Sequence, residues 1–138
     1  MPNEKKRVQT KVVSSLKSLS AFGHEPVFGI PGEPDVVFRG GIAECKELDA
    51  WPKRNGIVKL PHWTIAQKRW HNNWIKNGGL GWVVLKVGRK DWLLFDSITA
   101  INYLGCVDKA ELFAIAERYW TKGFDHADFR QHIMNAVS

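Results

Sequence analysis

Apolar and charged residues alternate with the period of a helix at the start of the chain. Val8, Val12 and Leu16 recur every four residues, with lysines elsewhere around the same turns. This spacing predicts an amphipathic helix over residues 4–20. The following stretch, 22–34, is rich in glycine and proline and is expected to hold no long element.

Three more helices are predicted, over about 64–77, 108–120 and 126–136. The first has the clearest limits. Thr64 and Gln67 form a T-x-x-Q capping box at its start, and a Gly-Gly pair follows its last turn.

Four strands are predicted in two pairs. Residues 35–39 and 42–47 read as a β-hairpin that turns at a Gly-Gly pair, and strands at 81–88 and 92–96 form the second pair. Because a helix separates the two pairs, the order of elements predicts an α/β fold with a mixed β-sheet flanked by helices.

The size and composition of the chain suit one domain. It has 138 residues, of which 44% are hydrophobic, and no repeat or linker divides it. We therefore expect a single domain over residues 1–138, with a core at about 4–96 and a helical extension at about 97–138.

Two cysteines make no disulfide framework, and MPNEKKR at the N-terminus is not followed by the apolar stretch of a signal peptide. No phosphate-binding glycine loop and no zinc-ligand spacing is present.

Charge is distributed unevenly along the chain. Residues 1–90 carry 16 Lys and Arg against 7 Asp and Glu, a net charge of +9, whereas residues 91–138 carry 4 against 7, a net charge of −3. A phosphate backbone is the natural partner for such an asymmetry. A basic surface without any such partner is the open alternative.

The predicted hairpin carries charges among Val, Phe, Ile and Ala. Glu44 and Lys46 share one side of its second strand, about 7 Å apart, and Asp35 begins the first strand directly after Pro34. Converging carboxylates repel unless a cation lies between them, and a hard ion such as Mg²⁺ suits their oxygens. A neighbouring lysine could then orient a water or stabilise charge on a phosphate. An ordinary cross-strand ion pair is the alternative.

The segments E-P-D at 33–35 and E-C-K at 44–46, eight residues apart, resemble the PD-(D/E)xK nuclease motif. The chain is most similar to the VRR-NUC and Holliday-junction-resolvase-like endonucleases, many of them phage-encoded. Gln67 and the segment 81–84 also match their pattern, and the resemblance covers about residues 4–96. It implies a restriction-endonuclease-like core, built as helix, strand hairpin, helix and strand.

By this resemblance the chain would be a Mg²⁺-dependent endodeoxyribonuclease, with Mn²⁺ able to substitute. Asp35, Glu44 and the main-chain carbonyl of Cys45 would hold the metal. Lys46 would be the catalytic lysine, and Gln67 would support the site.

Members of the family often complete the site with a glutamate from the first helix. Here that helix offers only Glu4, at its frayed start. Glu33 is a second candidate, or else a solvated turn residue.

The resemblance also implies DNA as the partner, with branched DNA the expected substrate. Two symmetric cuts would require a homodimer. Such an enzyme would work in the cytoplasm of a bacterial or phage-infected cell. Five basic residues are candidates for phosphate contact, although a solvated face is the commoner role: Lys53, Arg54, Lys59, Lys68 and Arg69. A non-catalytic nucleic-acid-binding module on the same fold is the alternative function.

The tryptophans divide by position. Trp51 and Trp63 flank the basic loop, where they either stack on an unpaired base or pack the loop. Four others are predicted to be core residues: Trp70, Trp74, Trp82 and Trp92.

Overall fold

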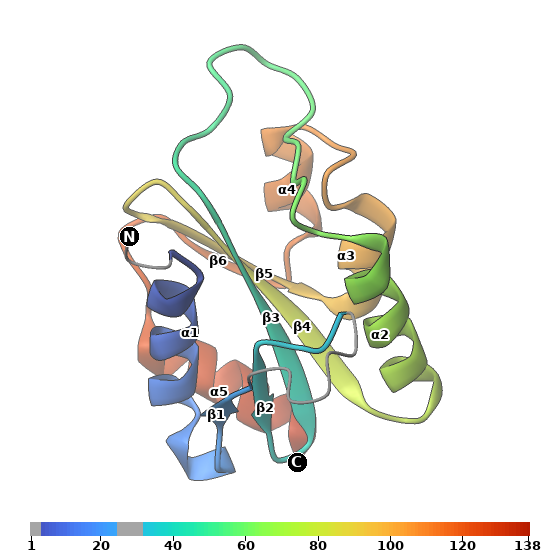
Figure 1. The fold of residues 1–138 in the computed structure, drawn as a ribbon. Helices are drawn as coiled ribbons and strands as arrows, with labels where there is room; N and C mark the ends of the chain where they lie inside the picture. Colours follow the sequence, from blue (N-terminus) through green and yellow to red (C-terminus); the bar gives the residue numbers. More distant parts are fainter. Residues whose placement is uncertain (1–3, 25–31) are drawn as a thin grey trace.

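The computed structural model describes residues 4–24 and 32–138, with side chains described from residue 7 onward. Figure 1 shows how the helices and strands are arranged. In chain order these elements are α1 (Glu4–Ser15), the 3-10 helix η1 (Lys17–Leu19), β1 (Phe22–Gly23), β2 (Val36–Phe38), β3 (Gly41–Leu48), α2 (Ile65–Lys76), β4 (Leu80–Val87), β5 (Asp91–Asp96), α3 (Ser97–Tyr103), α4 (Lys109–Ile115), β6 (Arg118–Trp120) and α5 (His126–Val137).

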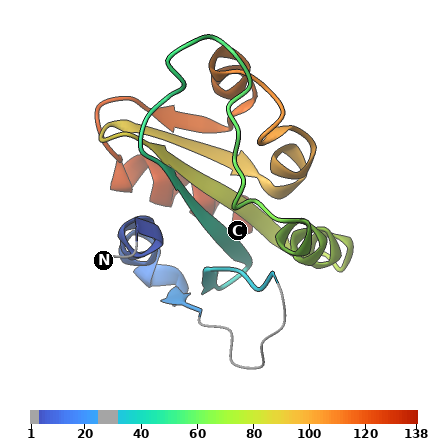
Figure 2. The ribbon, with the colours of Figure 1, turned by 45° about the horizontal axis from the view of Figure 1, so that its top comes forward.

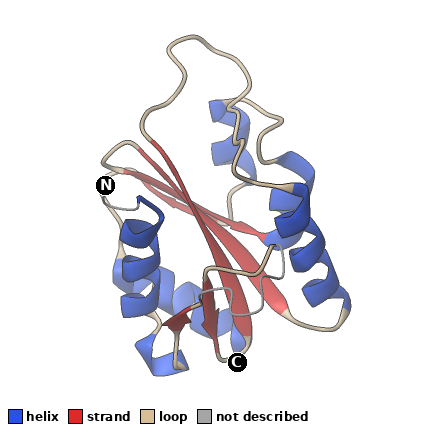
Figure 3. Ribbon diagram, in the orientation of Figure 1, coloured by secondary structure: helices blue, strands red, loops and turns tan. Residues whose placement is uncertain are grey.

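One six-stranded sheet runs through the described part of the chain, in the order β1-β2-β3-β4-β5-β6 (Figure 3). β3 and β4 are parallel, and the other neighbours are antiparallel. A tight turn cannot join parallel strands, so the chain crosses from β3 through a loop and α2 before it returns as β4. The predicted mixed sheet is confirmed, and helix, hairpin, helix and strand follow in the predicted order.

Helices cover both faces of the sheet (Figure 2). α1 and α5 pack on one face, over a buried cluster that includes Val12 and Phe129. α3, α4 and the loop before α2 pack on the other face, over a cluster that includes Phe95 and Leu112. No helix in the described residues has both the length and the apolarity needed to cross a membrane.

The first helix is shorter than predicted. α1 ends at Ser15, and η1 follows it, with Ser20 in the left-handed conformation at a φ of 58°. Ser15 donates its hydroxyl to the carbonyl of Lys11, one turn back, as serines that compete with helix hydrogen bonding do. The chain then reaches the sheet edge as β1, which has only two residues and leaves no period-two pattern to detect.

The C-terminal extension is not only helical, which corrects the prediction for residues 108–120. α4 ends at Ile115, and the chain continues as β6, antiparallel to β5. Pairing covers the outer edge of β5, which a longer helix would leave open. The Trp120 ring also packs against Phe124, at a centroid distance of 5.4 Å.

Two of the four predicted core tryptophans are not core residues. Trp82 and Trp92 are 4% and 1% exposed, as predicted. Trp70 and Trp74 are only partly buried and belong to neither cluster. The reason is that α2 turns His71 toward the sheet instead, which leaves the tryptophan stripe on the flank of the helix.

Candidate active site

The β2–β3 hairpin brings the predicted site residues together. It turns at Arg39 and Gly40 rather than at two glycines, because Gly41 already pairs with Phe38. Asp35 directly precedes β2, and its Oδ2 accepts a hydrogen bond of 2.9 Å from the main-chain N–H of Cys45. This bond places the Asp35 carboxylate against the strand that carries the other two charged residues.

The three charged side chains predicted to form the site are buried. Glu44 is 0% exposed, Asp35 2% and Lys46 6%. Side chains alternate along β3, so Glu44 and Lys46 share one face of the sheet, while Cys45 between them joins the cluster under α1 and α5. Burying an ion costs several kcal/mol unless partners compensate it, so the neighbours of these groups decide their role.

Gln67 on α2 joins the buried carboxylate to the buried amine. Its Oε1 accepts a hydrogen bond of 2.9 Å from Lys46 Nζ, and its Nε2 donates to Glu44 Oε2 at 3.2 Å. Lys46 also donates to the carbonyl of His62 at 2.7 Å and lies 3.7 Å from Glu44 Oε2. Gln67 completes the capping box with Thr64 at the same time, so one side chain fixes both the helix start and the site.

His71, one helical turn beyond Gln67, is a residue of this site that the sequence did not reveal. Its Nε2 lies 3.5 Å from Glu44 Oε1, and its Nδ1 lies 2.7 Å from Ser97 Oγ. Burial lowers the pKa of His71 to about 4, although the Asp35 carboxylate partly opposes this, so the ring is neutral near pH 7. A neutral ring suits both neighbours when Ser97 donates to Nδ1 and the Nε2–H points at the carboxylate.

Gly81 on β4 makes room for this arrangement. A Cβ atom at this position would lie 2.4 Å from Ser97 Oγ and 3.4 Å from His71 Nδ1. The glycine therefore allows α2 and the start of α3 to approach the sheet behind Glu44. The i, i+4 spacing of Gln67 and His71 is the one sequence signal that could have identified the histidine.

Asp35 and Glu44 supply carboxylate oxygens, the donor type that a hard divalent cation prefers. Within the described ranges, no three His, Cys, Asp or Glu side chains gather closely enough to form a metal cluster. Asp35 and Glu44 would therefore act with main-chain and water oxygens, a coordination that suits Mg²⁺. Glu33 is not a solvated turn residue, since its side chain is 8% exposed and lies 3.0 Å from His24 Nε2. The side chain of Glu4 lies outside the described residues.

The candidate phosphate-contacting residues are accessible. Lys53, Arg54 and Lys59 are exposed on the loop between β3 and α2, which rises above the sheet in Figure 1. Arg69 on α2 is exposed and Lys68 is partly so. The same loop ends at His62, whose carbonyl holds Lys46, so one continuous segment links the basic residues to the buried charges.

Trp51 and Trp63 pack the loop and are not free to stack on a base. Trp63 is 4% exposed, and its indole N–H donates to the carbonyl of Ala100. Trp51 is partly buried and donates to Asp91 Oδ2 at 2.7 Å.

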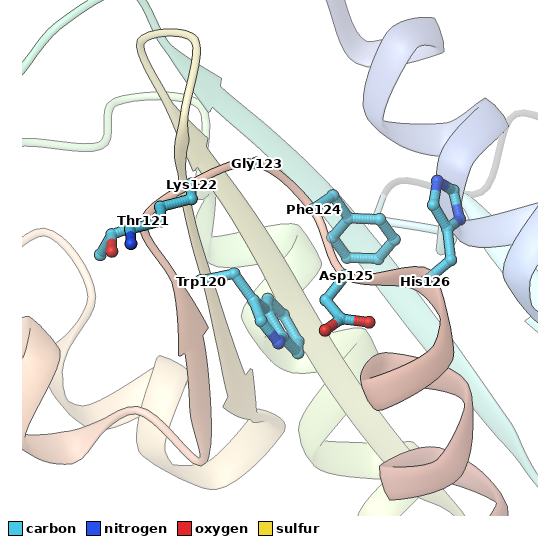
Figure 4. Close-up of a pocket in the computed structure, with 7 residues that line it drawn as sticks. All are labelled: Trp120, Thr121, Lys122, Gly123, Phe124, Asp125 and His126. Atoms are coloured by element: carbon cyan, nitrogen blue, oxygen red, sulfur yellow. The ribbon is translucent and has the colours of Figure 1, made fainter.

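A separate pocket of about 510 Å³ lies between β6 and α5, lined by residues 120–126 (Figure 4). His126 in this pocket lies 2.6 Å from Ser15 Oγ, and burial lowers its pKa. None of the predicted site residues lines this pocket.

Neither a protein-family model nor a curated protein matches the sequence. Among solved structures, the chain is similar to the Holliday junction resolvase Hjc of the hyperthermophile Archaeoglobus fulgidus. The two share 18% sequence identity with a TM-score of 0.47, and the match covers 70% of this chain and 75% of that one.

Proposed function

We propose that the protein is a Mg²⁺-dependent DNA endonuclease of the PD-(D/E)xK type, related to the VRR-NUC and resolvase-like enzymes. The observation that carries this proposal is the buried cluster of Glu44, Lys46 and Gln67, with Asp35 bound to the same strand. These are the residues of the E-P-D and E-C-K segments, together with Gln67, that resemble the PD-(D/E)xK motif.

A purely structural ion pair explains this cluster less well. Glu47, on the same strand, shows what such a pair looks like here: its buried side chain lies 2.9 Å from Arg7 and 3.8 Å from Lys86, two cations that are 51% and 16% exposed. Buried pairs contribute little net stability, because desolvation cancels most of the attraction. Two buried carboxylates held to one strand, with a buried lysine beside Glu44, are instead the arrangement expected where a cation and a phosphate complete the charge balance.

The chain's own groups would divide the work as follows. Asp35, Glu44 and the Cys45 carbonyl would hold the divalent ion, which supplies positive charge and lowers the pKa of a water. Lys46, fixed by Gln67 and the His62 carbonyl, would donate to a phosphate oxygen or orient the attacking water. Water would add to phosphorus as the bond to one ester oxygen breaks, leaving a phosphate end and a hydroxyl end.

We further propose that His71 and Ser97 are positioning residues. Ser97 Oγ lies 2.7 Å from Nδ1 of His71 and would fix the imidazole ring. The Nε2 atom of that ring lies 3.5 Å from Glu44 Oε1, so it would keep Glu44 Oε2 directed toward Lys46 and Gln67. Branched DNA is the proposed substrate, and the protein would act on it as a homodimer, since paired cuts need two sites of opposite orientation.

A nicking assay tests the proposal. Wild-type protein is incubated with a four-way junction, a flap, a plain duplex and a single strand, in Mg²⁺, in Mn²⁺ and in excess chelator. We expect cutting of branched DNA only with metal, and its loss in Lys46→Met. Undiminished cutting in excess chelator would refute the proposed metal site. Tight DNA binding without any cutting would favour the non-catalytic nucleic-acid-binding module.

A further inference from the structure

A second aromatic feature lies on α2, outside the buried charges. Trp70 and Trp74 stack on each other, with ring centroids 5.7 Å apart and an interplanar angle of 25°. Together with Asn73 and Asn77 they line a surface pocket of about 350 Å³. Neither tryptophan serves the core clusters, and neither has a role in the chemistry above.

The two rings are held differently. Trp74 donates its indole N–H to the carbonyl of Leu80 at 2.8 Å and lies against Gly79, where a Cβ atom would come within 2.3 Å of the indole nitrogen. Trp74 therefore forms a fixed base. Trp70 rests on it, and in the described part of the chain its indole N–H has no acceptor. A flat aromatic surface is thus kept in place on the flank of α2, with Trp74 tied to the start of β4 and Trp70 in neither core cluster.

The charge of the helix indicates what this surface binds. The sequence of α2, IAQKRWHNNWIK, contains Lys68, Arg69 and Lys76 and no acidic residue. Stacked aromatic rings beside cationic side chains are the features that hold unpaired nucleotides, since every base presents a flat face and every linkage a negative charge. Asn73 and Asn77 add amide groups that can both donate to and accept from the edge of a base.

The pocket begins about one helical turn from the side chain that holds Lys46. Ala66, Trp70 and Trp74 follow i, i+4 spacing, so they form one stripe of α2. Ala66 lies in the first turn of α2, at the N-terminal end of that stripe. Gly32, three residues before Asp35, lies so close to this turn that a Cβ atom on it would come within 2.2 Å of the Ala66 carbonyl oxygen. Gln67, which holds Lys46, is only three residues from Trp70, or about 4.5 Å along the helix axis.

We infer that Trp70 and Trp74 form a stacking platform for an unpaired nucleobase beside the phosphate that is cut. The preferred substrate would then be DNA with at least one unpaired nucleotide at its branch point. This inference rests on the proposed nuclease function for the position of the cut, but base stacking itself does not require cleavage and can be tested without it.

Binding in excess chelator, where no cutting is expected, gives the first test. The probes are a fully paired four-way junction and the same junction with three unpaired thymidines at the branch. Trp70→Ala should weaken binding of the second probe about 5- to 150-fold, the range for losing one stacked base, and change the first by less than about twofold. Trp70→Phe should restore most of the loss. Tyr103→Ala, which removes an exposed aromatic ring from α3, is the matched control and should bind both probes like wild type.

Intrinsic fluorescence provides a second measurement. An oligothymidine should quench the fluorescence of the wild-type protein, and the change should be smaller in Trp70→Phe. Equal losses for both junctions, or no loss for either, would overturn the inference. Self-association that Trp70→Ala abolishes, without any effect on DNA, would assign the pocket to a contact between two copies instead. If stacking is found but Mg²⁺ permits no cutting, the nuclease proposal fails alone; if cutting is found but Trp70→Ala has no effect, the platform fails alone.

Discussion

Replacing Lys46 with methionine tests whether the buried charges act as one electrostatic unit. Lys46 Nζ lies 3.7 Å from Glu44 Oε2, with exposures of 6% and 0%. At an effective dielectric constant of about 20, two unit charges at this distance attract by ~4 kcal/mol. Methionine keeps most of the apolar stem, so Lys46→Met removes chiefly the ammonium and should lower the free energy of unfolding by ~3–5 kcal/mol, as breaking a buried pair does.

Thermal and urea unfolding in the absence of divalent ions provide the measurement. A loss of this size corresponds to a fall in Tm of about 10–20 °C for a domain of this length. The double variant Glu44→Gln/Lys46→Met should recover most of the loss, because neither charge then remains buried. Mg²⁺ should also reduce the deficit of Lys46→Met, because an ion bound to the folded state stabilises it.

Lys86→Met is the matched control. Lys86 lies 3.8 Å from Glu47, a distance close to that of the buried pair, but Glu47 keeps its 2.9 Å contact with Arg7. This variant should lose no more than ~1 kcal/mol, because Lys86 is partly exposed and Arg7 still compensates Glu47. Equal losses for Lys46→Met and Lys86→Met would refute the reasoning that the buried ammonium of Lys46 is what compensates Glu44.

Three other predictions address the metal, the buried histidine and the basic loop. Mg²⁺ should raise the Tm of the wild type but much less that of Asp35→Asn or Glu44→Gln, as followed by thermal unfolding over a metal titration; an equal rise in all three would place the ion elsewhere. Because the pKa of His71 is about 4 in the folded state and near 6.5 in the unfolded chain, the unfolded state binds the proton more readily, so stability should fall by up to ~3 kcal/mol as pH drops from about 6.5 to 4. Urea unfolding at several pH values should show this fall reduced in His71→Gln, and an identical pH profile would contradict it. Replacing Lys53, Arg54 and Lys59 together with glutamine should reduce the slope of log affinity against log salt by up to ~2.7 for duplex DNA; parallel lines would mean that the loop does not face the phosphates.

The sequence by itself determined the elements whose signals are local. Thr64, Gln67 and the glycines at 78 and 79 define α2 almost to the residue, and short apolar runs bounded by glycines or charged residues mark β3, β4 and β5. The charged residues of the hairpin were also visible, because Glu44 and Lys46 must share a face of any strand that contains them. Gln67 was included through its match to the family pattern, and the structure places it between the two charges.

Features that depend on distant partners were decided only by the tertiary structure. β1 and β6 exist because open sheet edges next to β2 and β5 accept them, although neither has a pattern of its own. Trp70 and Trp74 have the spacing of a core stripe, but α2 is rotated so that Gln67 and His71 face the sheet. That rotation follows from hydrogen bonds to Glu44 and Lys46 on β3 and to Ser97 at the start of α3. Periodicity states which residues share a face of a helix, whereas which face is buried depends on what the rest of the fold presents to it.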